Sequence, residues 1–141
     1  MKLIFYIAVC ILMLVESSIY SLYPYYFISI SFMGYISYKF EEEALYYNML
    51  IAFFISLYSS TIPYDIMFFI LFTILLKRMF KYILFHKFNI FIITLVEVLL
   101  YNIYILIFKK YEFVFIFWIK QYIFIFIYNY LFVTFEKKFS R

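Results

Sequence analysis

The feature that most constrains this chain is a series of long apolar runs that leaves almost no sequence for a polar surface. Hydrophobic residues make up 70% of the 141 residues and charged residues 14%. The charged residues fall in short clusters, and the longest polar stretch inside the chain is residues 39–43. A water-soluble domain needs a polar exterior, which this composition cannot supply. The sequence therefore predicts an integral membrane protein.

The apolar runs predict an all-α fold, a polytopic bundle of about six transmembrane helices that forms one domain over residues 1–141. A bilayer core about 30 Å thick takes roughly 20 helical residues to cross, so five or six spans use up the chain. Transmembrane strands alternate apolar and polar residues, whereas residues 51–55 and 123–127 are apolar at every position. The predicted spans are roughly residues 3–22, 24–38, 44–59, 63–80, 88–108 and 113–135.

The basic residues predict the orientation of these spans. With a cytoplasmic N-terminus, nine basic residues fall on the cytoplasmic side and two fall outside, as the positive-inside rule requires. The outward connections at residues 17–23 and 59–64 contain no lysine or arginine. We therefore expect both termini in the cytoplasm. The nine are Lys2, Lys39, Lys77, Arg78, Lys81, Lys87, Lys137, Lys138 and Arg141, and the two are Lys109 and Lys110.

Two local patterns concern the ends of spans. Lys2 followed by apolar residues 3–15 has the form of a signal peptide, but no small-x-small cleavage site follows cleanly and largely apolar sequence continues through residues 19–27. A retained first helix is favoured over cleavage. Pro63 lies between the third and fourth runs, and proline is preorganised for the start of a helix, so it predicts an outer turn that leads into the fourth span.

Ionisable residues inside the spans are costly and are the first candidates for function. Glu97 lies about nine residues into the fifth span and Lys120 about eight residues into the sixth. Because these spans run antiparallel, both side chains fall near the middle of the bilayer, where pairing would relieve both desolvation costs. We expect a Glu97–Lys120 ion pair that clamps two helices. The alternatives are a site for a substrate, ion or proton, and a lysine that reaches the interface beside a neutral Glu97.

The remaining polar residues predict packing rather than chemistry. Glu16, near the outer end of the first span, fits an interfacial position. A single histidine, His86, and a single aspartate, Asp65, give no metal cluster or catalytic pair, and one glycine gives no phosphate-binding loop. We therefore expect no enzyme, no cofactor, no metal and no nucleic-acid partner. Four amides are expected to form hydrogen bonds between helices: Asn48, Asn102, Gln121 and Asn129.

Residues 49–80 consist of an apolar run, a polar turn with Pro63, and a second apolar run that closes with the basic pair Lys77 and Arg78. This pattern resembles MreD, the small polytopic subunit of the bacterial rod-shape machinery. In that family a span ends in a polar turn, often with proline, and the next span ends in a basic cluster. Length and the six apolar runs match across essentially the whole chain. The sequence departs from the family at Ser56, where aspartate is frequent, and at Tyr64 and Asp65, where glycine is favoured. The matching residues are Leu57, Tyr58, Ser59, Ser60, Pro63, Lys77 and Arg78.

The resemblance implies a non-enzymatic scaffold of the elongasome in the bacterial inner membrane, which maintains rod shape and lateral peptidoglycan synthesis. It implies binding to MreC and, through it, to MreB, RodA and a transpeptidase. It also implies a fold like that of the substrate-binding subunits of energy-coupling-factor vitamin transporters. The alternative function is such a subunit itself, with a zwitterionic ligand between Glu97 and Lys120. Those subunits usually present small residues on the first span, where this chain offers Ala8 alone.

Overall fold

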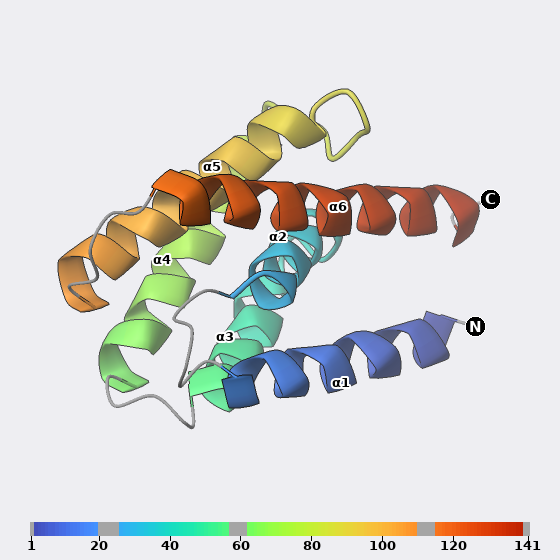
Figure 1. Cartoon of the computed structure of the whole chain (residues 1–141). Helices are drawn as coiled ribbons and strands as arrows, with labels where there is room; N and C mark the ends of the chain where they lie inside the picture. Colours follow the sequence, from blue (N-terminus) through green and yellow to red (C-terminus); the bar gives the residue numbers. More distant parts are fainter. Residues whose placement is uncertain (1, 20–25, 57–61, 110–114, 140–141) are drawn as a thin grey trace.

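A computed structural model of the protein describes residues 2–19, 26–56, 62–109 and 115–139, and the regular structure in these ranges is entirely helical. The predicted all-α fold is therefore confirmed, and each predicted span overlaps one α-helix (Figure 1). A π-helical turn, η1 (Ile105–Lys109), continues the fifth helix. The α-helices are α1 (Lys2–Ile19), α2 (Ile28–Lys39), α3 (Ala44–Ser56), α4 (Ile62–Phe80), α5 (Ile90–Tyr104) and α6 (Phe115–Phe139).

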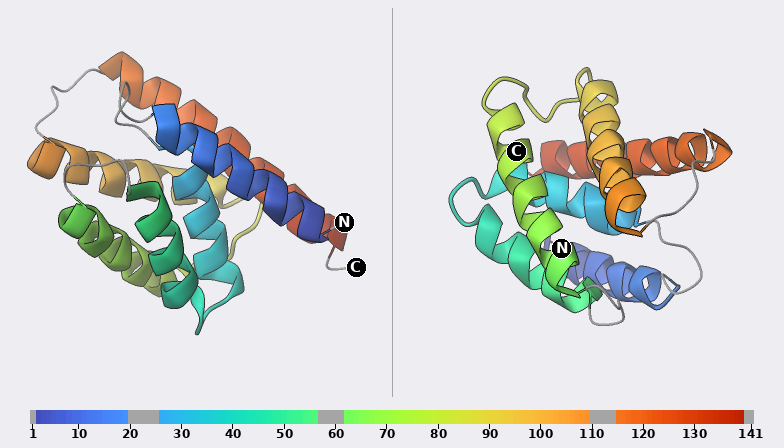
Figure 2. Two further views of the ribbon diagram at one scale, coloured as in Figure 1. Left: turned by 90° about the horizontal axis from the view of Figure 1, so that it is seen from below. Right: turned by 90° about the vertical axis from the view of Figure 1, so that its left-hand side faces the viewer.

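The shortest of these helices, α2, lies at the centre of the bundle. It packs against α1, α3, α4, α5 and α6 (Figures 1 and 2), and every residue from 28 to 37 is buried. Its 12 residues correspond to about 18 Å, less than the roughly 30 Å of a bilayer core. A helix enclosed by protein on all sides does not need to match that thickness.

Two opposite faces of α2 organise the apolar core. One face, which includes Ile30 and Met33, packs with buried side chains of α3, α4, α5 and α6. The other face, which includes Phe32, Tyr35 and Ile36, packs with buried side chains of α1 and α6. Both faces of α2 are covered by protein. Its three serines and its glycine are therefore buried among other helices and do not face the outside.

The start of α2 is capped by a side chain from another helix. The residue before α2 is Phe27, which supplies no side-chain cap. Instead the Glu16 carboxylate of α1 accepts hydrogen bonds from the backbone N–H of Phe27, from that of Ile28 (3.1 Å) and from both the N–H and the hydroxyl of Ser29 (3.0 Å each). These N–H groups have no partner within the helix and carry partial positive charge, so a carboxylate satisfies them well. Glu16 is thus a helix cap supplied across the bundle.

The other end of α2 is tied to the last turns of α6. Lys39 Nζ lies 2.6 Å from Glu136 Oε2, and the Tyr35 hydroxyl donates to the same oxygen at 2.5 Å. About a quarter of each charged side chain is exposed, so this pair is better shielded than a surface ion pair. The Phe5 ring of α1 stacks on Phe135 with 3.6 Å between centroids, which brings the start of α1 beside the end of α6.

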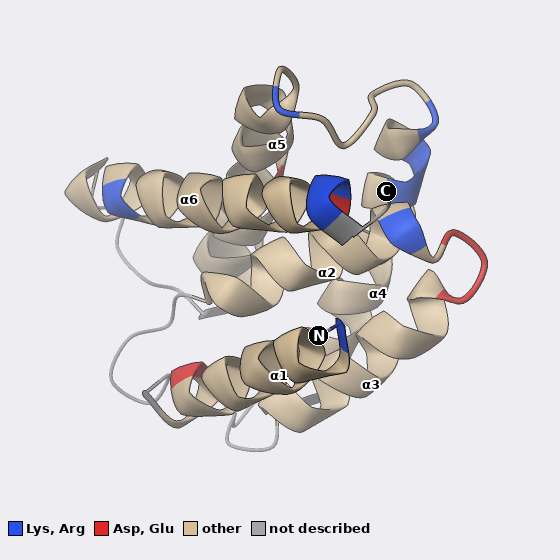
Figure 3. Cartoon of the chain, turned by 90° about the vertical axis from the view of Figure 1, so that its right-hand side faces the viewer, with Lys and Arg blue, Asp and Glu red and all other residues tan. Residues whose placement is uncertain are grey.

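Charges and apolar side chains are separated on the outside of the bundle. Lys and Arg residues and an acidic turn gather at the end where both termini lie (Figure 3). In α4, Asp65 lies in the first turn, whereas Lys77 and Arg78 lie in the last, which complements the helix dipole. The outer faces between the ends carry exposed large apolar side chains, for example Ile11, Phe53, Leu71, Leu99 and Ile127.

Two of the described helical segments are long and apolar enough to cross a membrane. They are Ile90–Phe108, with a mean hydropathy of 2.4, and Phe115–Lys138, with a mean hydropathy of 1.4. Ala44–Ser56 is apolar but shorter. By this criterion, α5 with its π-helical extension and α6 are the membrane-crossing candidates within the part of the chain that the structure describes.

The cross-helix cap predicts that Glu16→Gln destabilises the protein. A glutamine presents an NH₂ donor toward backbone N–H donors, so at least one of them loses its acceptor. Losing a cap costs about 0.5–2 kcal/mol, and we expect a loss in this range from thermal unfolding of the purified protein in detergent. Glu43→Gln is the control, because the Glu43 side chain accepts a hydrogen bond only from the hydroxyl of the exposed Tyr47 among the described residues. Equal melting temperatures for the two variants would contradict the capping role.

Candidate functional site

The buried face of α5 is partly polar. Buried positions recur at spacings of three and four residues, which is one face of an α-helix directed at the bundle interior. Three of these positions carry polar side chains other than tyrosine, and they bring polar groups of α5 into the core. The buried residues of α5 are Ile90, Ile93, Thr94, Glu97, Val98, Tyr101, Asn102 and Tyr104.

Glu97 belongs to a hydrogen-bonded group that joins three helices through Asn129. Its side chain is 0% exposed, and Asn129 Nδ2 donates to Glu97 Oε2 at 2.7 Å. The same amide donates to Thr94 Oγ1 at 3.1 Å, and its oxygen accepts from Ser31 Oγ at 2.6 Å. Ser31, Thr94, Glu97 and Asn129, from α2, α5 and α6, are called the Glu97 cluster below.

The second carboxylate oxygen of Glu97 lies against the backbone of Gly34. A β-carbon added at position 34 would lie 2.0 Å from Glu97 Oε1 and 3.2 Å from the carboxyl carbon, closer than real β-carbons approach. Gly34 is the only glycine in the chain, and it stands where α2 must come closest to the Glu97 side chain. Glu97 Oε1 itself is buried and has no hydrogen-bond partner among the described residues.

Two further polar contacts extend the interior network on either side of the Glu97 cluster. Asn102 Nδ2 donates to Gln121 Oε1 at 2.7 Å and joins α5 to α6. Asn48 Nδ2 lies 2.9 Å from Ser37 Oγ and 3.0 Å from Thr73 Oγ1, which joins α3 to α2 and α4. With the Asn129 contacts, these bonds confirm the prediction that the four amides connect helices.

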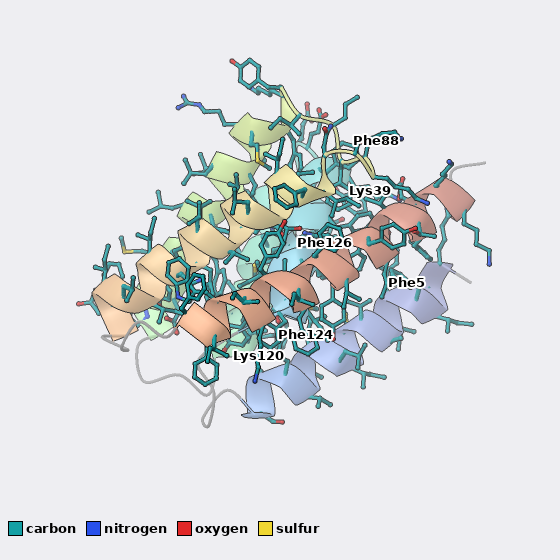
Figure 4. The ribbon with its side chains drawn as sticks, turned by 45° about the horizontal axis from the view of Figure 1, so that its top comes forward. Phe5, Lys39, Phe88, Lys120, Phe124 and Phe126 are labelled. Atoms are coloured by element: carbon teal, nitrogen blue, oxygen red, sulfur yellow. The ribbon has the colours of Figure 1, made fainter. Side chains whose placement is uncertain are left out.

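The structure does not bring Glu97 and Lys120 together. In α6, Gln121, Ile125 and Asn129 are buried one turn apart, whereas Lys120, a step of about 100° around the helix, is exposed. Its side chain points away from α5 (Figure 4). Asn129, the partner of Glu97 on α6, lies nine residues beyond Lys120, or about 14 Å along the helix. The expected ion pair is therefore not formed, because the rotation of α6 presents an amide to Glu97 and turns the lysine outward.

Two surface hollows lie away from the Glu97 cluster. An apolar groove of about 400 Å³ runs between α1, α2 and α3 and is lined by aromatic and aliphatic side chains, with Cys10 among them. A hollow of about 480 Å³ at the charged end is lined by Glu41, Glu42, Lys77, Arg78 and Lys81, with Leu45 and Ile74. Within the described ranges, no three His, Cys, Asp or Glu side chains are grouped so that they could hold a metal ion.

Sequence reasoning missed the members of the cluster other than Glu97 and Asn129. Gly34, which contacts the cluster without belonging to it, offered a signal, because a lone glycine in the middle of an apolar run marks a close approach of two helices. Ser31 and Thr94 offered less, because serine and threonine in spans often bond only to their own helix.

Comparison with known proteins finds no family model that matches, no similar curated protein and no similar solved structure. Of the residues that carry the MreD resemblance, 57–60 lie outside the described residues. Pro63 is the second residue of α4, which confirms the prediction that this proline marks the start of a helix. The site is therefore interpreted from its own contacts.

The contact between Gly34 and Glu97 predicts an unusual sign for Gly34→Ala. Alanine in place of glycine stabilises an ordinary helix interior by about 0.5–1 kcal/mol. At position 34 the added methyl group enters the space of the Glu97 carboxylate, so we expect a loss of about 1–3 kcal/mol. Thermal melting in detergent measures it. Adding Glu97→Ala, which empties that space, should make the double variant less destabilised than the sum of the two single changes. A stabilising Gly34→Ala would contradict the contact.

Proposed function

We propose that the protein is a multi-pass membrane protein whose six helices lie in the bacterial inner membrane. The apolar side chains exposed on the outer faces of α1, α3, α4, α5 and α6 support this proposal, because a surface of this kind is stable in lipid and not in water. Buried polar side chains such as Glu97, Asn102 and Asn129 form hydrogen bonds with other side chains and with backbone carbonyls inside the bundle, as groups in a bilayer must. The short α2 is shielded from lipid by its neighbours.

Both termini belong on the cytoplasmic side in this proposal. The start of α1 and the end of α6 lie at the same end of the bundle (Figures 1 and 2), as an even number of crossings requires. That end also carries most of the described basic residues (Figure 3), and cytoplasmic ends of membrane helices are rich in lysine and arginine.

Within the membrane we propose a non-enzymatic scaffold role like that of MreD, with MreC as its direct partner and MreB, RodA and a transpeptidase reached through it. A scaffold role is supported by the interior polar groups, which form hydrogen bonds between helices of this chain. Ser31, Thr94, Glu97 and Asn129 hold α2, α5 and α6 to one another, while broad apolar faces remain available to a membrane helix of another protein. The link to the elongasome rests on the sequence resemblance.

The alternative is a vitamin-binding subunit of an energy-coupling-factor transporter, which shares length and architecture with this chain and for which a Glu97–Lys120 pocket would suit a zwitterionic ligand. These side chains lie on different sides of α6, and protein atoms of Gly34 and Asn129 fill the surroundings of the Glu97 carboxylate. The packing favours the scaffold over this alternative.

The proposed topology predicts which positions react with an impermeant thiol reagent in intact cells. In a Cys10→Ser background, Ser60→Cys in an outward connection should be labelled, because it faces the periplasm. A cysteine added at the C-terminus should react only after the cells are opened. Labelling of the C-terminal cysteine in intact cells, with protection of Ser60→Cys, would contradict the proposed orientation.

The scaffold proposal predicts co-purification with a single-span membrane protein. Loops as short as these cannot bury the roughly 1,000 Å² of a stable interface, so the contact should lie within the membrane. Extraction in mild detergent should recover MreC with the full-length protein, and depletion should round rod-shaped cells without changing vitamin uptake. Recovery of transporter ATPases with a bound small molecule would support the alternative function.

A further inference from the structure

Among the residues that the structure describes, no positive charge lies beside Glu97 to balance an ionised carboxylate. The parts of α2 and α6 that contact it present Ser31, Gly34 and Asn129. Leu76 of α4 lies near the same side of Gly34 as the Glu97 carboxyl group. Among the described residues, the structure gives Glu97 one hydrogen-bond donor and no ion pair.

The titratable groups on the helices packed around Glu97 face other partners. On α2 and α6, Tyr35, Lys39 and Glu136 bond to one another at the charged end. On α6, Lys120 is exposed, and on α4, Lys77 lines the hollow at the charged end. Asp65 is in the first turn of α4. The ring of Tyr101, one turn from Glu97 on α5, packs on Tyr26 and Phe68.

Glu16 shows how the same fold surrounds another carboxyl group with hydrogen-bond donors. Both of its oxygens accept hydrogen bonds, four in all, at the start of α2. Glu97 accepts one on Oε2, and Oε1 is buried against Gly34 without a donor among the described residues. An ionised carboxylate offers about four acceptor sites, and a buried one without a partner charge takes up a proton instead.

We propose that Glu97 is a proton-binding site. The carboxyl group takes one proton from water on Oε1 and keeps Oε2 as the carbonyl oxygen that accepts from Asn129. The neutral carboxyl is the form around which α2, α5 and α6 pack, and releasing the proton would leave a bare charge against the α2 backbone. No other bond is made or broken, and the proposal stands independently of the scaffold role.

Infrared spectroscopy of the full-length protein in lipid vesicles at neutral pH tests this proposal. A protonated carboxyl has a carbonyl stretch that carboxylates lack, so the wild-type protein should show this band. Glu97→Gln should remove the band, and Glu16→Gln should leave it. Absence of the band from the wild-type protein would overturn the proposal without any variant. Its loss in Glu16→Gln but not in Glu97→Gln would overturn it as well.

Two further measurements still test the proposal if one of these variants folds poorly. Asn129→Leu removes the donor to the carbonyl oxygen, so it should move the band to higher frequency and leave its intensity. Glutamine is close in shape to a neutral glutamic acid, so Glu97→Gln should have the melting temperature of the wild-type protein. The melting temperature of Glu16→Gln should be about 2–8 °C lower. A drop for Glu97→Gln as large as that for Glu16→Gln would show that the ionised form is the one the fold requires.

Discussion

The arrangement of the whole bundle depends on keeping the polar groups of one short, enclosed helix satisfied without water. α2 is buried along nearly its full length, so its free N–H groups and its serine hydroxyls need partners from other helices. Glu16 satisfies the first turn, Asn129 binds Ser31, and Asn48 binds the Met33 carbonyl. Each bond fixes the rotation of a different helix around α2, because only one face of that helix carries the required side chain.

This constraint explains how segments far apart in the sequence become neighbours. α1 is necessary to the bundle because it carries the cap of α2, and its start is held against the end of α6 by the stacking of Phe5 on Phe135. α5 and α6 are joined by Asn102–Gln121 as well as by the Glu97 cluster. An outer layer of large apolar side chains remains once these polar contacts are made, and it is this layer that a lipid environment would cover.

The number and order of the helices were predictable from the sequence, because each apolar run is long enough to form a helix and each charged cluster is too short to be anything but a connection. The positions of the four amides in the interior were predictable for a similar reason, since an unbonded amide in lipid is costly. The partner of Glu97 was not predictable from the sequence. Lys120 and Gln121 differ by one position and point in directions about 100° apart. The sequence indicated how far along α6 each residue lies, but it did not indicate how α6 is rotated about its axis.

The cap of α2 was not predictable from the sequence for a different reason. Glu16 accepts hydrogen bonds from Ile28 and Ser29, from which it is separated by a connection whose residues 20–25 have no evident motif. Capping rules look for the acceptor within the same turn. Gly34 could have predicted that another helix packs closely against α2, but nothing in the sequence indicates that the carboxyl group of Glu97 makes this contact. Contacts that depend on the rotation of two helices need the structure.

The central claim, that the exposed faces of these helices contact lipid while the polar faces meet inside, is tested most directly on α6. Nitroxide spin labels would be placed singly at Phe124, Ile127 and Leu131 on the exposed face and at Ile125 on the buried face, in lipid vesicles. Labels on the exposed face should collide with dissolved oxygen and be shielded from a water-soluble nickel complex, and the label at position 125 should be shielded from both. Ready collision of the nickel complex with labels at all three exposed positions would show that this face lies in water and would contradict the account.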